Sequence, residues 1–299
     1  MIIDSHAHYS HRRFDQTFRC LTYEKGVYSI EESSREKLLS GLMKSGFKAS
    51  VEPAIGIDSN EKVCQLALDH PGFIFPAYGC HPTRTFSAKW RDRKIIDKYA
   101  EGSDNCVAIG ETGLDYHYKR REQHRLCQKR WFRYQIKLAG KLDKPLILHI
   151  RKAYADALKI LKQHRKLLKG GVAHCFCEDV TVARSYVDLG FHIGIGGSLL
   201  TEEYGEVLSD VVRQIPLERI IVETDAPFVL PDTDAIGNTN KKYRIRNTSF
   251  VINAVIERIA EIKGIPVSAA ERTIYTSTAD LFALRSLLPG ADEQDAGGL

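Results

Sequence analysis

Short apolar runs alternate with longer amphipathic stretches along most of this chain. Consecutive apolar residues predict buried strands, and a spacing of three or four between apolar residues predicts helices packed on them. The expected strands are residues 2–4, 49–55, 73–78, 107–109, 145–149, 171–174, 191–195 and 220–222. The expected helices include residues 34–46, 90–99, 121–142, 154–164, 250–263 and 276–284. Eight strands alternating with helices predict an α/β fold, the closed (β/α)8 or TIM barrel.

The predicted barrel accounts for nearly the whole chain. No linker divides the 299 residues, and 43% of them are apolar, which is enough for one large core. We therefore expect a single domain over residues 1–286. From Pro289 onward the residues are mostly small or acidic, and we expect residues 287–299 to be a disordered C-terminal tail.

Composition also bears on the cellular compartment in which the protein is expected. No apolar run approaches the ~20 residues of a membrane span, and the first residues lack the basic start and apolar centre of a signal peptide. Seven cysteines without regular spacing fit a reducing compartment. We expect a cytoplasmic protein without a membrane partner. The net charge of +5 favours an anionic partner only weakly.

Six possible metal ligands follow or end predicted strands. They are His6, His8, Glu111, His149, His174 and Asp225. Because the carboxyl ends of barrel strands share one face, we expect these side chains at the same mouth. Each has a structural alternative, since a single histidine is often a hydrogen-bonded core residue and an aspartate can cap a turn. The complete set favours a metal site.

The number of these ligands favours two ions. Four imidazoles and two carboxylates exceed the three protein ligands of a typical single-zinc catalytic site. Residues two apart in an extended chain point to the same side, so the His-x-His pair can hold one ion together. The expected division gives one ion to His6, His8 and Asp225, the other to His149 and His174, and Glu111 to both as a bridge. Such ligands suit zinc, manganese or cobalt, and magnesium with additional waters.

Longer motifs surround these ligands. They are His6-x-His8, Gly110-Glu111-Thr112-Gly113-Leu114-Asp115-Tyr116, His149-Ile150-Arg151, His174-Cys175-Phe176 and Glu223-Thr224-Asp225-Ala226-Pro227. As a set they resemble the TatD family of metal-dependent deoxyribonucleases in the amidohydrolase superfamily. The resemblance implies a (β/α)8 barrel and metal-dependent deoxyribonuclease activity. Glu111 and Asp225 are the expected catalytic residues, with Asp225 accepting a proton from the attacking water. Cys177 and the long segment after His8 depart from the family pattern and bear on substrate preference.

Several basic residues are candidates for contacts with substrate phosphates. His81 stands in a Cys-His-Pro element that resembles the Gly-x-His-Pro element of the family, although a turn histidine explains it equally well. Arg151 offers a planar fork two residues after His149. The loop that follows Asp225 adds Lys241, Lys242, Arg244 and Arg246.

The segment from Tyr9 to Ser33 is expected to be a long loop that begins at the mouth and gates or clamps the substrate. Its cations, which include Arg12, Arg13 and Arg19, could meet phosphates. Its aromatic residues could stack on unpaired bases or simply pin the loop to the barrel. These aromatic residues are Tyr9, Phe14, Phe18 and Tyr23.

The favoured function is exonuclease-type hydrolysis of DNA, with a single strand or an end as the expected partner. Hydrolysis of a small ester, lactone or amide remains an alternative, because fold alone does not assign function. A further alternative is a nucleic-acid-binding protein with a vestigial site. A protein partner encoded in the same operon is a further expectation. The sequence leaves the oligomeric state open and is compatible with a monomer.

Overall fold

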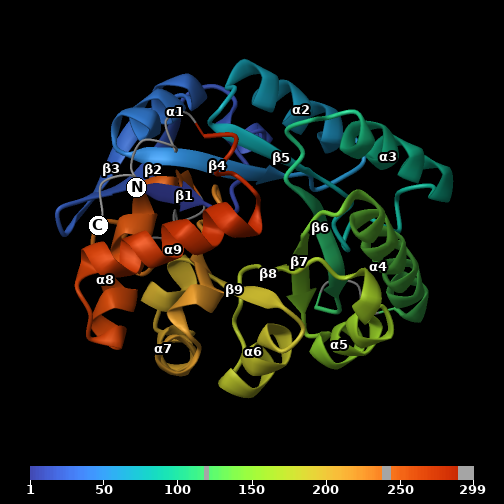
Figure 1. Ribbon diagram of the computed structural model, residues 1–299. Helices are drawn as coiled ribbons and strands as arrows, with labels where there is room; N and C mark the ends of the chain where they lie inside the picture. Colours follow the sequence, from blue (N-terminus) through green and yellow to red (C-terminus); the bar gives the residue numbers. More distant parts are fainter. Residues whose placement is uncertain (118–120, 238–243, 289–299) are drawn as a thin grey trace.

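Eight parallel strands form the central sheet of the computed structural model, which describes residues 1–117, 121–237 and 244–288 (Figure 1). They are β1 (Ile2–Asp4), β4 (Phe47–Pro53), β5 (Ile74–Tyr78), β6 (Ala108–Asp115), β7 (Leu146–Arg151), β8 (Gly171–Ala173), β9 (Phe191–Ile195) and β10 (Ile220–Val222), adjacent in that order. The first and last strands meet where Ser5 N–H donates to Val222 O, at 3.1 Å, and Ala7 pairs with Ala226. The predicted (β/α)8 barrel is confirmed.

Helices between the strands cover the outside of the barrel (Figure 1). They are α1 (Arg35–Lys44), α2 (Ser59–Asp69), α3 (Arg93–Glu101), α4 (Glu122–Leu142), α5 (Tyr154–Gln163), α6 (Val180–Val187), α7 (Gly205–Gln214), α8 (Ile252–Lys263) and α9 (Val267–Leu281). The sequence did not predict α6, whose valines favour strands. The last helix runs from Val267 to Leu281 rather than over residues 276–284, because its buried stripe already begins at Ala270 and Ile274.

The predicted long loop after His8 is wrong, because most of it is a β-hairpin. Strands β2 (Phe18–Glu24) and β3 (Val27–Ser33) pair in antiparallel fashion, and β11 (Ile245–Arg246) joins β2 to make a small second sheet. Lys25 and Gly26 form the turn with φ of 50° and 85°, the conformation that tight hairpins favour. The hairpin is seen beside α1 in Figure 1.

The aromatic residues of this segment are buried rather than available to bases. Tyr9 and Phe14 are 0% and 1% exposed, and Phe18 and Tyr23 are 6% and 7% exposed. Tyr9 also bonds through its hydroxyl to Ser249 at 2.5 Å. The prediction that these rings stack on substrate is therefore wrong, and the alternative that they pin the segment to the barrel holds.

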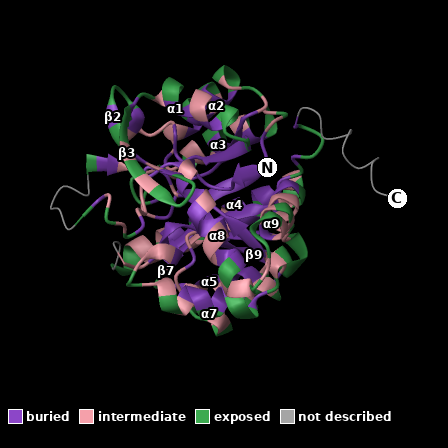
Figure 2. Cartoon of the chain, turned by 90° about the vertical axis from the view of Figure 1, so that its left-hand side faces the viewer, coloured by how far each residue is buried: buried purple, intermediate pink, exposed green. Residues whose placement is uncertain are grey.

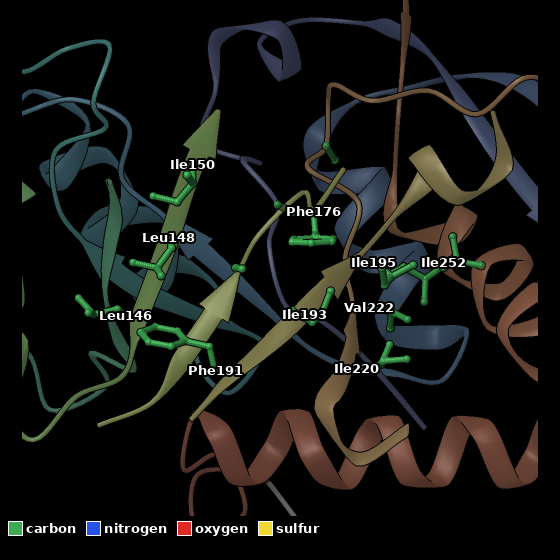
Figure 3. Close-up of a cluster of buried hydrophobic side chains, with 14 of the residues drawn as sticks. Leu146, Leu148, Ile150, Phe176, Phe191, Ile193, Ile195, Ile220, Val222 and Ile252 are labelled. Atoms are coloured by element: carbon green, nitrogen blue, oxygen red, sulfur yellow. The ribbon is translucent and has the colours of Figure 1, made fainter. Parts of the chain in front are cut away.

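Alternation along the strands decides which side chains enter the barrel. Leu146, Leu148 and Ile150 follow one another on β7 and pack in the cluster drawn in Figure 3. Ile147 instead belongs to a second cluster with Val172 and residues from almost every other strand. Only the barrel interior brings these strands together, so Ile147 and Val172 point inward. Two residues further along each strand, on the same side, stand His149 and His174.

Burial follows this arrangement. Figure 2 shows buried residues gathered at the centre and exposed residues on the outer faces of the helices. Leu288 is 8% exposed and packs in the inner cluster, so the packed chain reaches at least residue 288. The tail was predicted to begin at residue 287, which is wrong for the packed Leu288, and residues 289–299 lie outside the described residues. Among those described, no helix is both long and apolar enough to cross a membrane.

Candidate metal centre at the mouth of the barrel

The six candidate ligands converge at the carboxyl ends of the barrel strands. His6 and His8 follow β1, Glu111 lies in β6, and Asp225 follows β10. His149 belongs to β7, and His174 comes directly after β8. Apart from His6, which is 0% exposed, all of them line one cleft of about 470 Å³. The structure therefore brings the sequence-predicted set together at one mouth.

One group of ligand atoms gathers around His6, His8 and Asp225. The two imidazole Nε2 atoms are 3.1 Å apart, and Asp225 Oδ1 lies 3.7 Å from His6 Nε2 and 3.3 Å from His8 Nε2. Ligand atoms that share one zinc-sized ion at about 2.1 Å each lie about 3–3.5 Å from one another. These spacings fit a common ion.

Glu111 joins this group to a second one. Its Oε2 lies 3.7 Å from His6 Nε2 and 3.5 Å from His8 Nε2. Its Oε1 lies 3.2 Å from His149 Nδ1 and 3.1 Å from His174 Nε2. One carboxylate thus turns a different oxygen to each pair of histidines, which is the geometry that a bridging ligand needs.

The position of Glu111 in its strand differs from the prediction. The sequence placed Glu111 where the strand ends, but β6 continues to Asp115. The pairing of β6 with β7 shifts between Ile109 and Thr112, so the strand is irregular at this point. An irregularity of this kind re-aims a side chain without ending the strand. Asp115 is thereby carried to the same mouth.

The main chain holds the first group in place. His8 Nδ1 bonds to Pro53 O at 3.1 Å, which leaves Nε2 to face Glu111 and Asp225. Asp225 N–H donates to His6 O at 2.9 Å, and His8 N–H donates to Ala226 O at 2.7 Å. These bonds tie the His-x-His segment to the Asp225 segment. A histidine whose second nitrogen meets an oxygen acceptor is typical of metal sites.

Two further carboxylates, Asp115 and Glu223, hold the second group. His149 Nε2 lies 3.2 Å from Asp115 Oδ2, and His174 Nδ1 lies 3.3 Å from Glu223 Oε1. Sequence analysis named neither residue as functional. The inward alternation Ile221, Glu223 could have revealed the second of them, because Ile221 belongs to the inner cluster.

Charge in the site is set by burial and by these neighbours. Burial disfavours an ionised Glu111, but the surrounding imidazoles, among them that of His174, hold the pKa of its carboxyl well below the usual range. Burial also opposes charge on His174, yet Glu223 and Glu111 raise the pKa of its ring well above the usual value. Burial, together with His174, lowers the pKa of His6. Glu111 is therefore ionised and His6 neutral, the states in which each binds a metal, whereas the ring of His174 would have to lose a proton before it could bind one.

The other residues predicted to contact substrate differ in how close they lie to the cleft. His81 lines the cleft, with Nε2 3.5 Å from Glu111 Oε1, whereas Arg151 is half-buried and is not part of the cleft lining. Arg244 is exposed beside β11, and Arg246 is half-buried with Nε donating to Arg13 O at 3.1 Å. Lys241 and Lys242 lie outside the described residues.

The cleft also contains residues that the sequence did not single out, among them His11, Arg84 and Phe228. Each stands close in sequence to a candidate ligand or to His81. No motif marks them, and proximity along the chain was the available signal.

Comparison with known proteins identifies the family. The family model described as TatD related DNase matches residues 3–283, so this chain belongs to that family and the predicted resemblance is confirmed. The 3'-5' ssDNA/RNA exonuclease TatD of Rahnella sp. is 31% identical over 242 residues, which are 81% of this chain and 86% of the relative. The crystal structure of YjjV, a TatD homologue from Escherichia coli K12, superimposes with a TM-score of 0.78 at 24% identity, covering 94% of this chain and 98% of that one.

Another relative matches over a shorter stretch. The uncharacterized metal-dependent hydrolase YcfH of Escherichia coli is 37% identical over 179 residues, which are 60% of this chain and 63% of the relative. The match thus spans less than two thirds of that relative's length.

Proposed function

We propose that this protein is a metal-dependent nuclease that removes nucleotides from the 3' end of single-stranded DNA or RNA. The observation that best supports this proposal is the position of Glu111, whose two carboxylate oxygens face two different pairs of histidines. The exonuclease named among the relatives supports the choice of substrate. Both the family and the two groups of candidate ligands joined by Glu111 favour metal-dependent hydrolysis of an ester bond.

The ligand set fits two divalent ions. His6, His8, Glu111 and Asp225 would hold one, and His149, His174 and Glu111 would hold the other. Ions bound here supply positive charge that makes water a better nucleophile at neutral pH and offsets charge developing on the phosphate. The donors are imidazole and carboxylate, which suits zinc, manganese or cobalt and leaves magnesium possible.

The remaining steps fall to side chains of this protein. Asp225 orients the attacking water and accepts its proton, because it is the half-buried carboxylate that opens into the cleft. His81 donates a hydrogen bond to the phosphate. Its Nδ1 accepts the Thr83 N–H at 3.1 Å, so the proton of the neutral ring sits on Nε2, the atom that faces Glu111. Arg84 offers a charged contact at the rim of the cleft.

A substrate panel tests this function. The purified chain is assayed with manganese or magnesium on labelled single-stranded DNA, duplex DNA, RNA and small carboxylic esters. We expect stepwise shortening of single strands from the 3' end, its loss with a chelator and its return when the metal is restored. Turnover of the small esters alone would contradict the nuclease proposal and favour the esterase alternative. Metal-free protein whose DNA binding is unaffected by the chelator would favour the binding-protein alternative.

A further inference from the structure

The cleft has two unlike walls. Beside His81 it is lined by Thr83 and Arg84, a hydroxyl and a guanidinium. Near His8 it is lined by His11 and Phe228, two flat rings. Each wall is fixed to the metal centre through the main chain: Arg84 N–H donates to His81 O at 2.9 Å, and Phe228 N–H donates to Asp225 O at 2.8 Å.

Phe228 lies at the centre of the aromatic wall. The centroid of its ring is 5.3 Å from that of His11 and 6.2 Å from that of His8. The guanidinium of Arg13 lies over the ring, 5.0 Å from the centroid. Both Phe228 and His11 are half-buried, so neighbours hold the rings while part of each still reaches the cleft. A ring held in this way loses little freedom when a flat ligand stacks on it.

Among the described residues that line this wall, none carries a charge directed into the cleft, and its one possible hydrogen-bond donor is the ring of His11. Its cleft-lining members are two rings, and the positive charge of Arg13 is directed at the ring of Phe228. The groups of the cleft lining best suited to a phosphate, the hydroxyl of Thr83 and the guanidinium of Arg84, stand beside His81 instead. An unpaired base is flat and apolar on both faces, and stacking on aromatic and guanidinium groups is how proteins bind such bases without selecting their sequence.

We propose that Phe228 and His11, backed by Arg13, bind the base of the nucleotide that is being removed. The proposal rests on the proposed nuclease function, which puts the scissile phosphate between the two ligand groups and hence within one nucleotide of Phe228. A base that is still paired and stacked in a duplex does not offer its faces to this wall. The site therefore requires an unpaired terminal nucleotide and tolerates all four bases, and a cleft of about 470 Å³ suits a single nucleotide.

The test uses two single-stranded oligonucleotides that are identical except for the last residue at the 3' end, which carries a base in one and is abasic in the other. The readout is the ratio of their kcat/KM values for release of that residue. Wild-type protein should favour the substrate with the base by roughly 5- to 150-fold, the range expected for one stacked base. Phe228→Ala should bring the ratio close to one, and Phe228→Tyr should preserve it because the flat ring remains.

A matched control is Phe86→Ala. Phe86 is 52% exposed and contacts His124 rather than lining the cleft, so its loss should leave the ratio unchanged. Because each ratio is taken within one variant, partial unfolding or metal loss affects both substrates alike. A wild-type protein indifferent to the terminal base, or a Phe228→Ala variant that keeps the wild-type ratio, would overturn the base-binding wall and leave the nuclease function standing. If metal-loaded wild-type protein cleaves neither oligonucleotide, the nuclease proposal itself fails.

Discussion

The two halves of the candidate metal centre are held by different means. On the His8 side, the Pro53 carbonyl and main-chain bonds between the His6 and Asp225 segments fix the ligands. On the other side, the carboxylates of Asp115 and Glu223 orient His149 and His174. A carbonyl fixes the position of an imidazole, while a carboxylate also makes it a stronger base and a stronger ligand. The second half therefore depends on side chains that a single substitution can remove.

The two halves also differ in how the fold positions their residues. The first half is built where the ends of β1 and β10 meet, so closure of the barrel itself positions its ligands. The second half relies on Asp115 being carried past an irregular point in β6 and on Glu223 reaching across from the end of β10. Substitutions that disturb the barrel scaffold should therefore weaken metal binding by the first half, and substitutions that remove a carboxylate charge should weaken metal binding by the second.

The largest expected effect comes from Glu111, the residue that contacts both halves. Glu111→Gln keeps the size of the side chain and removes the charge, so neither group retains its shared anionic ligand. We expect kcat/KM on a single-stranded oligonucleotide to fall by roughly 1000-fold or more, since a metal-derived stabilisation of several kcal/mol is lost. Metal content should fall as well. The exposed Glu122→Gln serves as control, and wild-type activity in the Glu111 variant would exclude this centre as the active site.

The second-largest expected effect distinguishes the two halves of the candidate metal centre. Glu223→Gln and Asp115→Asn keep the shapes of their side chains and weaken only the carboxylate support of His174 and His149. We expect metal affinity or activity to fall by roughly 10- to 100-fold. In stepwise chelation followed by metal analysis, each variant should release one equivalent of metal before the wild-type protein does. If both equivalents leave together with unchanged affinity, the carboxylates do not set the difference between the halves.

The sequence was sufficient to predict the barrel and the common location of the candidate ligands. Strand ends in a closed parallel barrel share one face, so the order of strands along the chain already places residues such as His149 and His174 together. Their partners Asp115 and Glu223 were harder to recognise, because a carboxylate that supports a ligand has no spacing of its own. The division of the ligands between two ions remains a proposal.

The hairpin shows what the sequence did not reveal. Alternation in β2 is broken where Cys20 and Leu21 are both buried, and its turn is Lys25-Gly26 rather than the stronger Asn-Gly signal. Its other neighbour, β11, is distant in the sequence, so the pairing that stabilises this sheet depends on tertiary contact. Whether an aromatic residue such as Tyr9 is buried or exposed was likewise decided by packing rather than by local pattern.

The smallest expected effect compares two arginines, one on the carboxylate-held side of the cleft and one on the hairpin. Arg84 lines the cleft directly after the His81 turn, whereas Arg19 is an exposed residue of β2 that does not line it. If Arg84 contacts a phosphate, Arg84→Ala should flatten the dependence of log binding affinity on log salt concentration by about 0.7. Arg19→Ala should leave the slope unchanged, because most of the segment expected to clamp substrate is a hairpin with its rings buried.

Fluorescence anisotropy with a labelled single-stranded oligonucleotide gives both slopes. Every protein compared also carries Glu111→Gln, which blocks catalysis during the measurement. Equal flattening by the two substitutions would show that the strand also crosses the hairpin, and an unchanged slope in the Arg84 variant would remove this arginine from the phosphate path.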